Sequence, residues 1–227
     1  MITSNVIHRT FQIKWRDRIG SCFTIDVDGK QYLCSAKHYL NDYRTGQIEL
    51  FYREKWHNLE VEFVGHGSEN TDICVLSPKI QLSPPHSLPA TSEGLIFGQD
   101  VYFLGFPYGI QLEVGDLNRF FPLPLVKKAT VSSFFGGNQK IILLDGHNNR
   151  GFSGGPVVFK KVGSTKNELR VAAIISGYKF EPEPIFDENG KKTTLRYYAN
   201  TGIILSYDIK HALDAIRENP IGFEIKR

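Results

Sequence analysis

The sequence has little cysteine, little charge imbalance and no long apolar run. Its 227 residues include only 3 cysteines, and Lys plus Arg number 27 against 24 for Asp plus Glu. Cys22, Cys34 and Cys74 form no C-x-x-C motif, so the sequence predicts neither a metal site nor a redox pair built on them. Unpaired cysteines favour a reducing compartment. The near balance of charge gives no support for binding to nucleic acid or to a membrane surface.

The N-terminal segment also lacks the features of a targeting sequence. Polar residues, among them His8, Arg9 and Lys14, interrupt its apolar residues and leave no uninterrupted apolar stretch, so we expect no signal sequence here. No segment approaches the roughly 20 apolar residues that a membrane span needs. The chain has no N-x-[ST] glycosylation acceptor either. We therefore expect a soluble, cytoplasmic protein.

The apolar residues are arranged in short runs. Hydrophobic residues make up 41% of the chain, enough for one large domain or two small ones packed together. The runs are rich in Val, Ile, Phe, Tyr and Thr and end at Gly, Pro, Asn or Asp, a pattern typical of an all-β sandwich or barrel. The predicted strands are Val6–Lys14, Gly20–Val27, Gln31–Ser35, Gln47–Tyr52, Leu59–Gly65, Ile73–Leu76, Val101–Gly105, Lys127–Phe135, Lys140–Leu144, Pro156–Lys161, Leu169–Gly177 and Gly202–Leu205.

Two segments interrupt this pattern. Residues 77–94 hold four of the chain's 11 prolines and cannot complete a ladder of backbone hydrogen bonds, so we expect a linker between two halves. Residues 109–124 form a second long connection, of the kind that often has a function. Its Phe120 and Phe121 either cover the core or form an exposed recognition patch.

Only the C-terminal region clearly predicts a helix. Apolar residues from Ile209 to Ile216 recur at helical spacing, Ser206 is the expected N-cap, and Asn219-Pro220 ends the segment. We expect a helix over about residues 206–218 that packs on the sheet.

The segment Gly151-Phe152-Ser153-Gly154-Gly155-Pro156 carries the strongest chemical signal. A serine hydroxyl is a poor nucleophile. It needs a base within hydrogen-bond reach, and donors aimed at the oxyanion that forms when it attacks a carbonyl. Glycines on both sides allow a turn in which the backbone N–H groups of Gly151 and Ser153 point to one spot. Such a turn makes an anion hole without side chains.

A histidine is the expected base, and His38 is the best placed of the 7 histidines. It follows an apolar strand at the point where the chain leaves the sheet. The orienting acid is expected at Asp72, which opens the apolar run Ile73–Leu76. A partly buried carboxylate needs a partner, and an imidazole N–H supplies one. The alternative is that Asp72 caps a turn, because Asn-Thr-Asp is favourable turn chemistry.

These residues resemble the trypsin-like serine proteases. Gly151–Pro156 is similar to the G-x-S-G-G-P signature of that family, and the order His38, Asp72, Ser153 is the family's order. The resemblance is closest to the bacterial HtrA-type branch and spans roughly residues 18–215. The segments that carry it are Gly20-Ser21-Cys22-Phe23, Thr71–Leu76, Gly105-Phe106-Pro107-Tyr108-Gly109 and Thr201-Gly202-Ile203.

The resemblance implies an all-β fold of two six-stranded antiparallel β-barrels with a C-terminal α-helix and the active site between the barrels. The first barrel and the linker would occupy residues 1–94, and the second barrel and the helix residues 95–227, together one protease domain. His38 and Asp72 would come from the first barrel and Ser153 from the second.

Three differences between this sequence and the family pattern limit what the resemblance implies. Phe152 stands where secreted zymogens of the family have an Asp that pairs with a new N-terminus, so we expect no activation by that cleavage. Cys34 is the only nearby cysteine for the disulfide that often brackets the histidine, with Cys22 a doubtful partner. Few residues follow the expected helix, so we expect no PDZ domain. Substrate recruitment would then use barrel loops, another chain or a fused region.

The resemblance places His147 at the floor of the specificity pocket and Ser176 and Gly177 in one wall. A histidine there is not the acidic floor that selects Lys or Arg. It either accepts an acidic or polar side chain or is a solvated loop residue.

Two other functions fit part of the pattern. The same motif matches the G-x-S-x-G elbow of α/β-hydrolases, but the strand-like run Pro156–Phe159 follows it instead of a helix, and His211 is the only later histidine. The second alternative is a catalytically silent, protease-like peptide-binding module or sensor that needs a partner.

The sequence therefore predicts a regulated cytoplasmic serine endopeptidase that acts through a Ser153-His38-Asp72 triad and an acyl-enzyme. No metal and no organic cofactor is expected. The expected partners are a protein or peptide substrate and a regulatory protein, with neither nucleic acid nor a membrane involved.

Overall fold

The computed structural model describes residues 1–41, 43, 45–68, 70–112, 115–137, 140–164 and 168–226. Strands form two sheets, and each predicted strand is present. The strands are β1 (Thr10–Trp15), β2 (Arg18–Val27), β3 (Lys30–Ser35), β4 (Thr45–Tyr52), β5 (Lys55–His66), β6 (Cys74–Pro78), β7 (Asp100–Gly105), β8 (Leu125–Phe135), β9 (Ile141–Asp145), β10 (Pro156–Lys160), β11 (Leu169–Phe186), β12 (Lys192–Asp208) and β13 (Phe223–Glu224).

The first sheet closes on itself. Its strand order is β13-β3-β2-β1-β4-β5-β6, and a further pairing joins β3 to β6, so that β1 to β6 form a ring with β13 added beside β3. All these pairs are antiparallel. Phe11, Leu33 and Leu76 are among the side chains buried inside it.

The second sheet is a closed six-stranded barrel in the order β10-β11-β12-β9-β8-β7. Phe103, Phe152 and Phe159 fill much of its interior. The prediction of two six-stranded antiparallel barrels is therefore confirmed. A third apolar cluster joins the barrels, since it contains Phe23 and Val75 from the first and Leu104 and Ile174 from the second.

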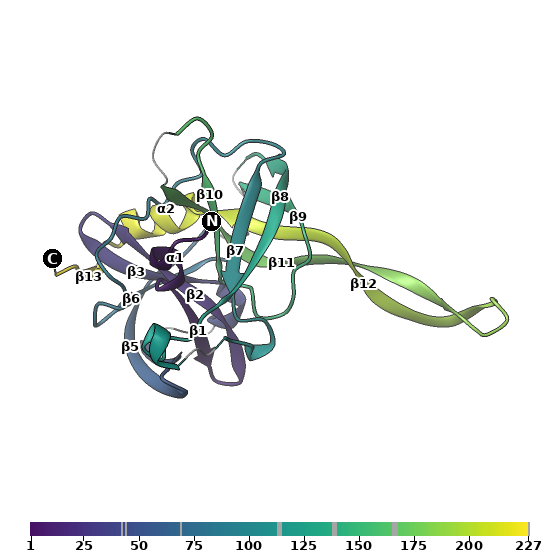
Figure 1. Cartoon of the computed structure of the whole chain (residues 1–227), viewed down its shortest axis with the longest axis horizontal. Coiled ribbons are helices and arrows are strands. Elements are labelled where there is room, and N and C mark those ends of the chain that lie inside the picture. The colour runs from purple at the N-terminus through teal and green to yellow at the C-terminus, as the bar shows by residue number, and fades with distance from the viewer. Residues whose placement is uncertain are drawn as a thin grey trace.

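Two helices add to this framework (Figure 1). The short α1 (Ser4–Ile7) precedes β1, where a strand from Val6 was predicted, because the His8 N–H donates to the Ser4 carbonyl at 2.8 Å in a helical turn. The C-terminal α2 (Lys210–Glu218) buries Ala212, Ala215 and Ile216 in the cluster between the barrels. Among the described residues, neither helix is long and apolar enough to cross a membrane.

The predicted start of the C-terminal helix at Ser206 is wrong. Ser206 lies in β12, opposite Ile142, and its hydroxyl donates to the Ile142 carbonyl at 2.7 Å. The strand therefore continues to Asp208, whose Oδ1 accepts the Lys210 N–H at 2.8 Å at the beginning of the helix. Sheet pairing competes with helix formation here and extends the strand.

The segment between the two barrels has little regular structure. From Lys79 to Gln99 it forms no strand, and its Ala90 makes a single bridge to Val171. It is fastened to the first barrel by Arg9, which is 1% exposed, pairs with Asp26 and donates to the carbonyls of Pro84 and His86. The predicted domain boundary at residue 94 separates β1–β6 from β7–β12, although β13 returns to the first sheet.

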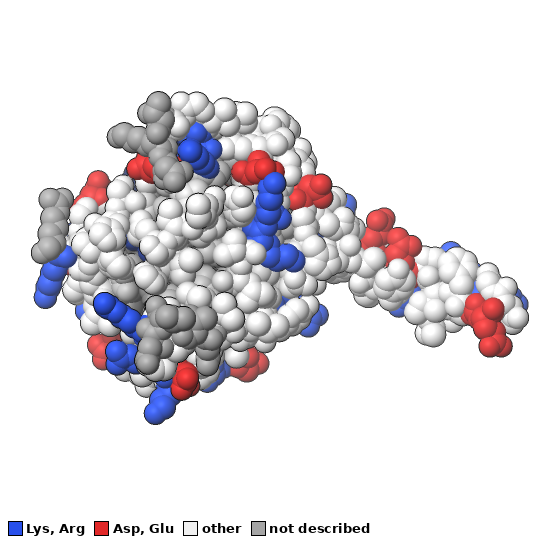
Figure 2. All heavy atoms as spheres, in the orientation of Figure 1, with Lys and Arg blue, Asp and Glu red and all other residues white. Residues whose placement is uncertain are grey.

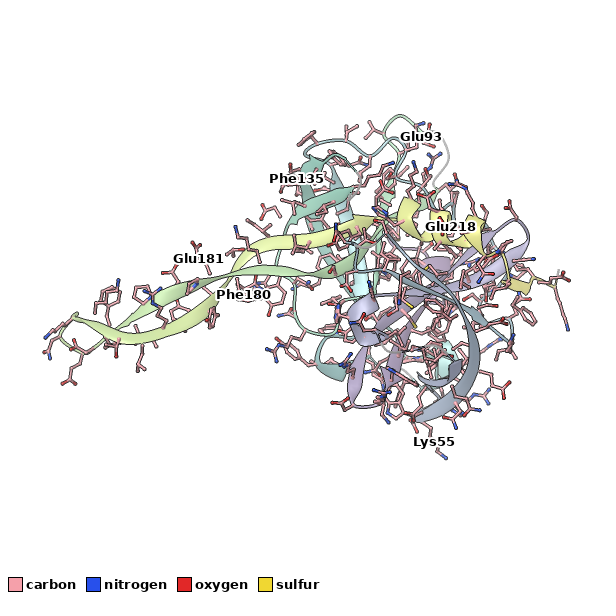
Figure 3. All side chains as sticks on the ribbon, turned by 180° about the vertical axis from the view of Figure 1, so that it is seen from behind. Lys55, Glu93, Phe135, Phe180, Glu181 and Glu218 are labelled. Atoms are coloured by element: carbon pink, nitrogen blue, oxygen red, sulfur yellow. The ribbon has the colours of Figure 1, made fainter. Side chains whose placement is uncertain are left out.

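Strands β11 and β12 continue far beyond the barrel as a two-stranded arm (Figure 1). The sequence predicted only Leu169–Gly177 and Gly202–Leu205 of these strands. In the arm, Phe180 pairs with Asn200 and Pro182 with Tyr198. Successive residues of a strand point to opposite faces, so Phe180 and Glu181 lie on opposite faces of the arm. Figure 3 shows both residues in the part of the arm near the barrel. The arm carries acidic and basic groups on the face that Figure 2 shows.

Candidate active site

His38 and Asp72 meet at one end of the first barrel. His38 lies in a 3₁₀-helix, Lys37–Tyr39, directly after β3, and Asp72 lies just before β6, the neighbour of β3. The His38 Nδ1 atom is 2.6 Å from Asp72 Oδ2, and the His38 backbone N–H donates to Asp72 Oδ1 at 2.8 Å. Pairing of β3 with β6 brings these two residues together.

The Asp72 carboxylate has a third donor from the other barrel. The Ser176 hydroxyl donates to Asp72 Oδ2 at 2.6 Å. Since an ionised carboxylate only accepts hydrogen bonds, the His38 nitrogen that faces it carries the proton, and Nε2 keeps a free lone pair. This arrangement can hold the imidazole in the tautomer that accepts a proton.

Ser153 lies in a tight turn between the two barrels. The Gly154 N–H donates to the Ile175 carbonyl at 2.7 Å, and the Ser153 carbonyl accepts the Ser21 N–H at 3.1 Å. The Ser153 side chain is almost buried, and its hydroxyl donates to the Ser176 carbonyl at 2.6 Å. The hydroxyl therefore faces β11 in this conformation.

The peptide between Arg150 and Gly151 has a defined orientation. Its carbonyl accepts the Tyr108 N–H at 2.9 Å. Because the C=O and N–H of a trans peptide point in opposite directions, the Gly151 N–H points away from Tyr108. Among the described residues, neither this N–H nor that of Ser153 donates a hydrogen bond. Both donors are thus available to an oxyanion.

Ser21 fixes the other side of this turn. Its hydroxyl donates to the Gly151 carbonyl at 2.6 Å and accepts the Phe106 N–H at 2.9 Å. Gly151 has a φ of +106°, and a Cβ on it would lie 2.4 Å from the Phe106 carbonyl oxygen. Only glycine fits at this position.

A cleft of about 500 Å³ opens above these groups. Residues of both barrels line it: Arg18, Ile19, His38, Tyr39, Phe106, Tyr108, Gly109, Asn149, Arg150, Gly151, Ser153 and Tyr178. The His38 side chain is 44% exposed. An extended polypeptide laid in the cleft would therefore reach both His38 and Ser153.

Tyr39 is a cleft residue that the sequence reasoning did not identify. Its ring centroid is 4.3 Å from that of His38, and Gly20 leaves room for it, since a Cβ there would lie 2.1 Å from Tyr39 Cε2. Burial raises the pKa of Tyr39; the Asp72 charge also raises it, and a hydrogen bond with Ser153 opposes the change. The phenol therefore stays neutral near pH 7.

The sequence indicated Ser21 and Tyr108 only as parts of the segments that resemble the trypsin-like proteases, and gave neither a role. Their contacts with the turn at Gly151 and Arg150 join residues from distant parts of the chain. No local pattern indicates such contacts.

The predicted pocket residues lie outside the lining of the cleft. His147 is exposed, and its carbonyl accepts a hydrogen bond from Lys127, whose pKa burial lowers. The Gly177 carbonyl accepts from Asn148, and Ser176 contacts Asp72 and Ser153 instead of a pocket. Their roles in substrate binding stay predictions.

Other predicted features can also be placed. Phe121 packs against Phe11 and His8 and so covers the first barrel, whereas Phe120 is exposed. Cys22, Cys34 and Cys74 are buried, and none of them forms a disulfide among the described residues. No metal-binding cluster of His, Cys, Asp and Glu exists among the described residues. Strand β10 follows Ser153, so the helix that an α/β-hydrolase elbow requires is not there.

Among solved structures, this chain is similar to Rv3671c from M. tuberculosis H37Rv, a serine-to-alanine mutant in its inactive form. The TM-score is 0.61 at 14% identity, covering 98% of this chain and 92% of that one. The HtrA-type protease AlgW with a tripeptide gives 0.58 at 22% identity, with coverage of 96% and 63%. The serine endoprotease from Yersinia pestis gives 0.58 at 20% identity, with coverage of 95% and 64%.

This chain thus spans slightly less than two thirds of the last two structures. The identities are low, so these similarities support the fold alone. A search of the curated proteins finds no relative. The sequence itself matches the model of the family described as "Trypsin-like peptidase domain" over residues 20–163, more than half of the 227 residues. The chain therefore belongs to the trypsin-like peptidase family.

Proposed function

We propose that this chain is a serine endopeptidase that cleaves peptide bonds of protein substrates. Ser153 Oγ forms a bond to the scissile carbonyl carbon while its proton moves to His38 Nε2. Asp72 holds the imidazole through Nδ1 and stabilises the imidazolium that forms. The N–H groups of Gly151 and Ser153 bind the oxyanion, and removal of one such donor typically lowers the rate about a hundredfold or more.

The same groups complete the reaction. His38 donates its proton to the leaving amine as the C–N bond breaks, which leaves an acyl-enzyme on Ser153. A water molecule then attacks the acyl carbon while His38 accepts its proton. His38 returns this proton to Ser153 Oγ as the acyl C–O bond breaks, which releases the carboxylic acid product and the free hydroxyl. No metal or organic cofactor enters any step.

The observation that carries this proposal is the 2.6 Å contact between His38 Nδ1 and Asp72 Oδ2 at a cleft that Ser153 also lines. A mixture of synthetic peptides incubated with the protein, with products read by mass spectrometry, tests it. Wild type is expected to cleave internal peptide bonds, and Ser153→Ala is expected to cleave none. Equal cleavage by both proteins would contradict the proposal.

The direction of the Ser153 hydroxyl supports regulation of this activity. It donates to the Ser176 carbonyl at 2.6 Å, so this hydrogen bond has to break before the proton moves to His38. The same observation favours the second candidate, a silent peptide-binding module. The two differ in outcome, because a module would bind peptides without turnover, with or without added partner proteins.

We also propose a cytoplasmic location. Support comes from the three cysteines, which are buried and form no disulfide among the described residues, a state that reducing compartments maintain. Burial raises the pKa of Cys22 and Cys34, which protects the thiols from oxidation. Fractionation of the source cells tests this location, and recovery of the protein outside the cytoplasm would contradict it.

A further inference from the structure

The described residues that line the candidate cleft carry positive charge and no negative charge. Among these residues, Arg18 and Arg150 carry fixed positive charges, and none is Asp or Glu. Arg18 begins β2 in the first barrel, and Arg150 precedes the turn of Ser153 in the second barrel. Each barrel therefore contributes one arginine to the cleft.

Neither arginine is neutralised by a carboxylate. Arg18 Nη1 donates to the His38 carbonyl at 2.8 Å, and no ion pair of Arg18 or Arg150 occurs within the described part of the chain. The negative group behind the cleft, Asp72, is already engaged by His38 and Ser176. Asp17 precedes Arg18 but does not line the cleft. The Arg150 guanidinium and the remaining N–H groups of Arg18 can therefore pair with an added anion.

The other residues that line the cleft strengthen the electric field of the two arginines. Tyr39, Phe106, Tyr108 and Tyr178 give the cleft apolar aromatic surface. Charges of one sign in a cleft with walls of low polarity produce a stronger local field than the same charges on a flat surface. A guanidinium also pairs with a carboxylate through two parallel hydrogen bonds.

We propose that the polypeptide that enters this cleft carries Asp or Glu close to the bond at Ser153, and that Arg18 and Arg150 recognise it. The inference rests on the proposed function and adds the substrate class. Each exposed arginine is expected to contribute a few-fold to the preference for an acidic side chain. Together they give about a tenfold preference over Lys or Arg, equivalent to about 1.4 kcal/mol.

A peptide mixture of equal composition tests this inference. The bonds that wild type cleaves are expected to have Asp or Glu within about two residues roughly ten times as often as Lys or Arg, and the ratio is expected to fall at high salt. The double variant Arg18→Glu, Arg150→Glu is expected to reverse the preference. Arg217→Glu makes the charge change of one of these two substitutions on the surface of α2, outside the cleft, and is expected to leave the preference unchanged.

Two results would overturn the inference: cleavage without enrichment of acidic residues, and an enrichment that the double variant retains. Failure of the proposed function is a separate result, in which no peptide is cleaved and a fluorophosphonate does not label Ser153. In that case, the binding of dye-labelled peptide pools to Ser153→Ala, measured by fluorescence anisotropy, still tests whether the cleft prefers acidic peptides. Acidic pools are expected to bind about tenfold more tightly than lysine pools, and equal binding would overturn the inference.

Discussion

Asp72 accepts hydrogen bonds from donors of both barrels, which makes its ionised form integral to the site. Two come from His38 and one from the Ser176 hydroxyl. The sequence predicted the His38 pairing, because a carboxylate before an apolar strand needs a partner. The Ser176 contact could not be predicted, since it depends on how the two barrels dock. The direction of the Ser153 hydroxyl was not predictable for the same reason.

Asp72→Asn tests the role of the carboxylate. An amide can donate to His38 Nδ1, which moves the imidazole proton to Nε2 and removes the base. We expect kcat/KM on a cleavable peptide to fall about 10³- to 10⁴-fold at pH 7, with an unchanged melting temperature. Asp145→Asn, at the exposed end of β9, is the matched control. Turnover within about threefold of wild type would remove Asp72 from this role.

Ser21→Ala tests the support of the anion hole. The change leaves the Gly151 carbonyl and the Phe106 N–H without their buried partner. We expect the free energy of unfolding to fall by about 1–3 kcal/mol and the rate of fluorophosphonate labelling to fall as well.

Ser206→Ala is the control for Ser21→Ala. It removes another fully buried serine hydroxyl, bonded to Ile142 and away from the cleft. This variant is expected to lose stability and to keep the labelling rate. If both variants label at the wild-type rate, Ser21 has no part in shaping the hole.

At the scale of elements, the predicted strands occur where the apolar residues of an alternating pattern pack against a hydrophobic core. The arm was missed because its residues face solvent on both sides: Phe180, Tyr197 and Tyr198 are all more than half exposed. Pro182 and Pro184 further weaken the strand pattern there, since proline lacks the N–H that a ladder uses. The helix start was misplaced because Ser206 is needed for pairing with β9.

The linker is attached to the first barrel by contacts that join several elements. Arg9 joins α1, β1 and β2 to residues 84–86 through the Asp26 pair and two carbonyls. Removal of one member of a buried pair leaves the other uncompensated, so Arg9→Met is expected to lower the free energy of unfolding by about 3–5 kcal/mol.

Urea unfolding measures the effect of Arg9→Met. The double variant Arg9→Met, Asp26→Leu is expected to regain part of the loss, because it leaves no unpaired charge. A loss below about 1 kcal/mol for the single variant would show that the pair does not hold the linker.

At the scale of the whole molecule, the two barrels share an apolar interface and the arm stands apart from it. None of the three core clusters contains a residue of the arm between Tyr178 and Ile203. Replacement of residues 180–199 by a short glycine-containing turn is therefore expected to change the free energy of unfolding by no more than about 1 kcal/mol.

The arm deletion keeps Tyr178 in the cleft and Asn200, which donates to the Asn148 carbonyl at 2.8 Å. Its rate of fluorophosphonate labelling should then equal that of wild type. Thermal melting and labelling on the same preparations check both expectations. Loss of folding, or a labelling rate lowered more than about tenfold, would show that the arm supports the site.

The order of the matching motifs along the chain allowed the overall fold to be predicted, because that order fixes which barrel carries each residue. The lining of the cleft could not be predicted in the same way. Tyr39 and Arg18 enter it through the packing of the barrels, whereas His147, expected there, lies outside.

The central claim is that the Ser153 hydroxyl is activated by His38 and Asp72. Reaction with a fluorophosphonate, followed by mass spectrometry of the digested protein, tests it most directly. The account predicts one modified residue, Ser153, in wild type, and loss of the modification in both Ser153→Ala and His38→Ala. Folded wild-type protein that stays unmodified, or a His38→Ala variant that reacts at the wild-type rate, would contradict it.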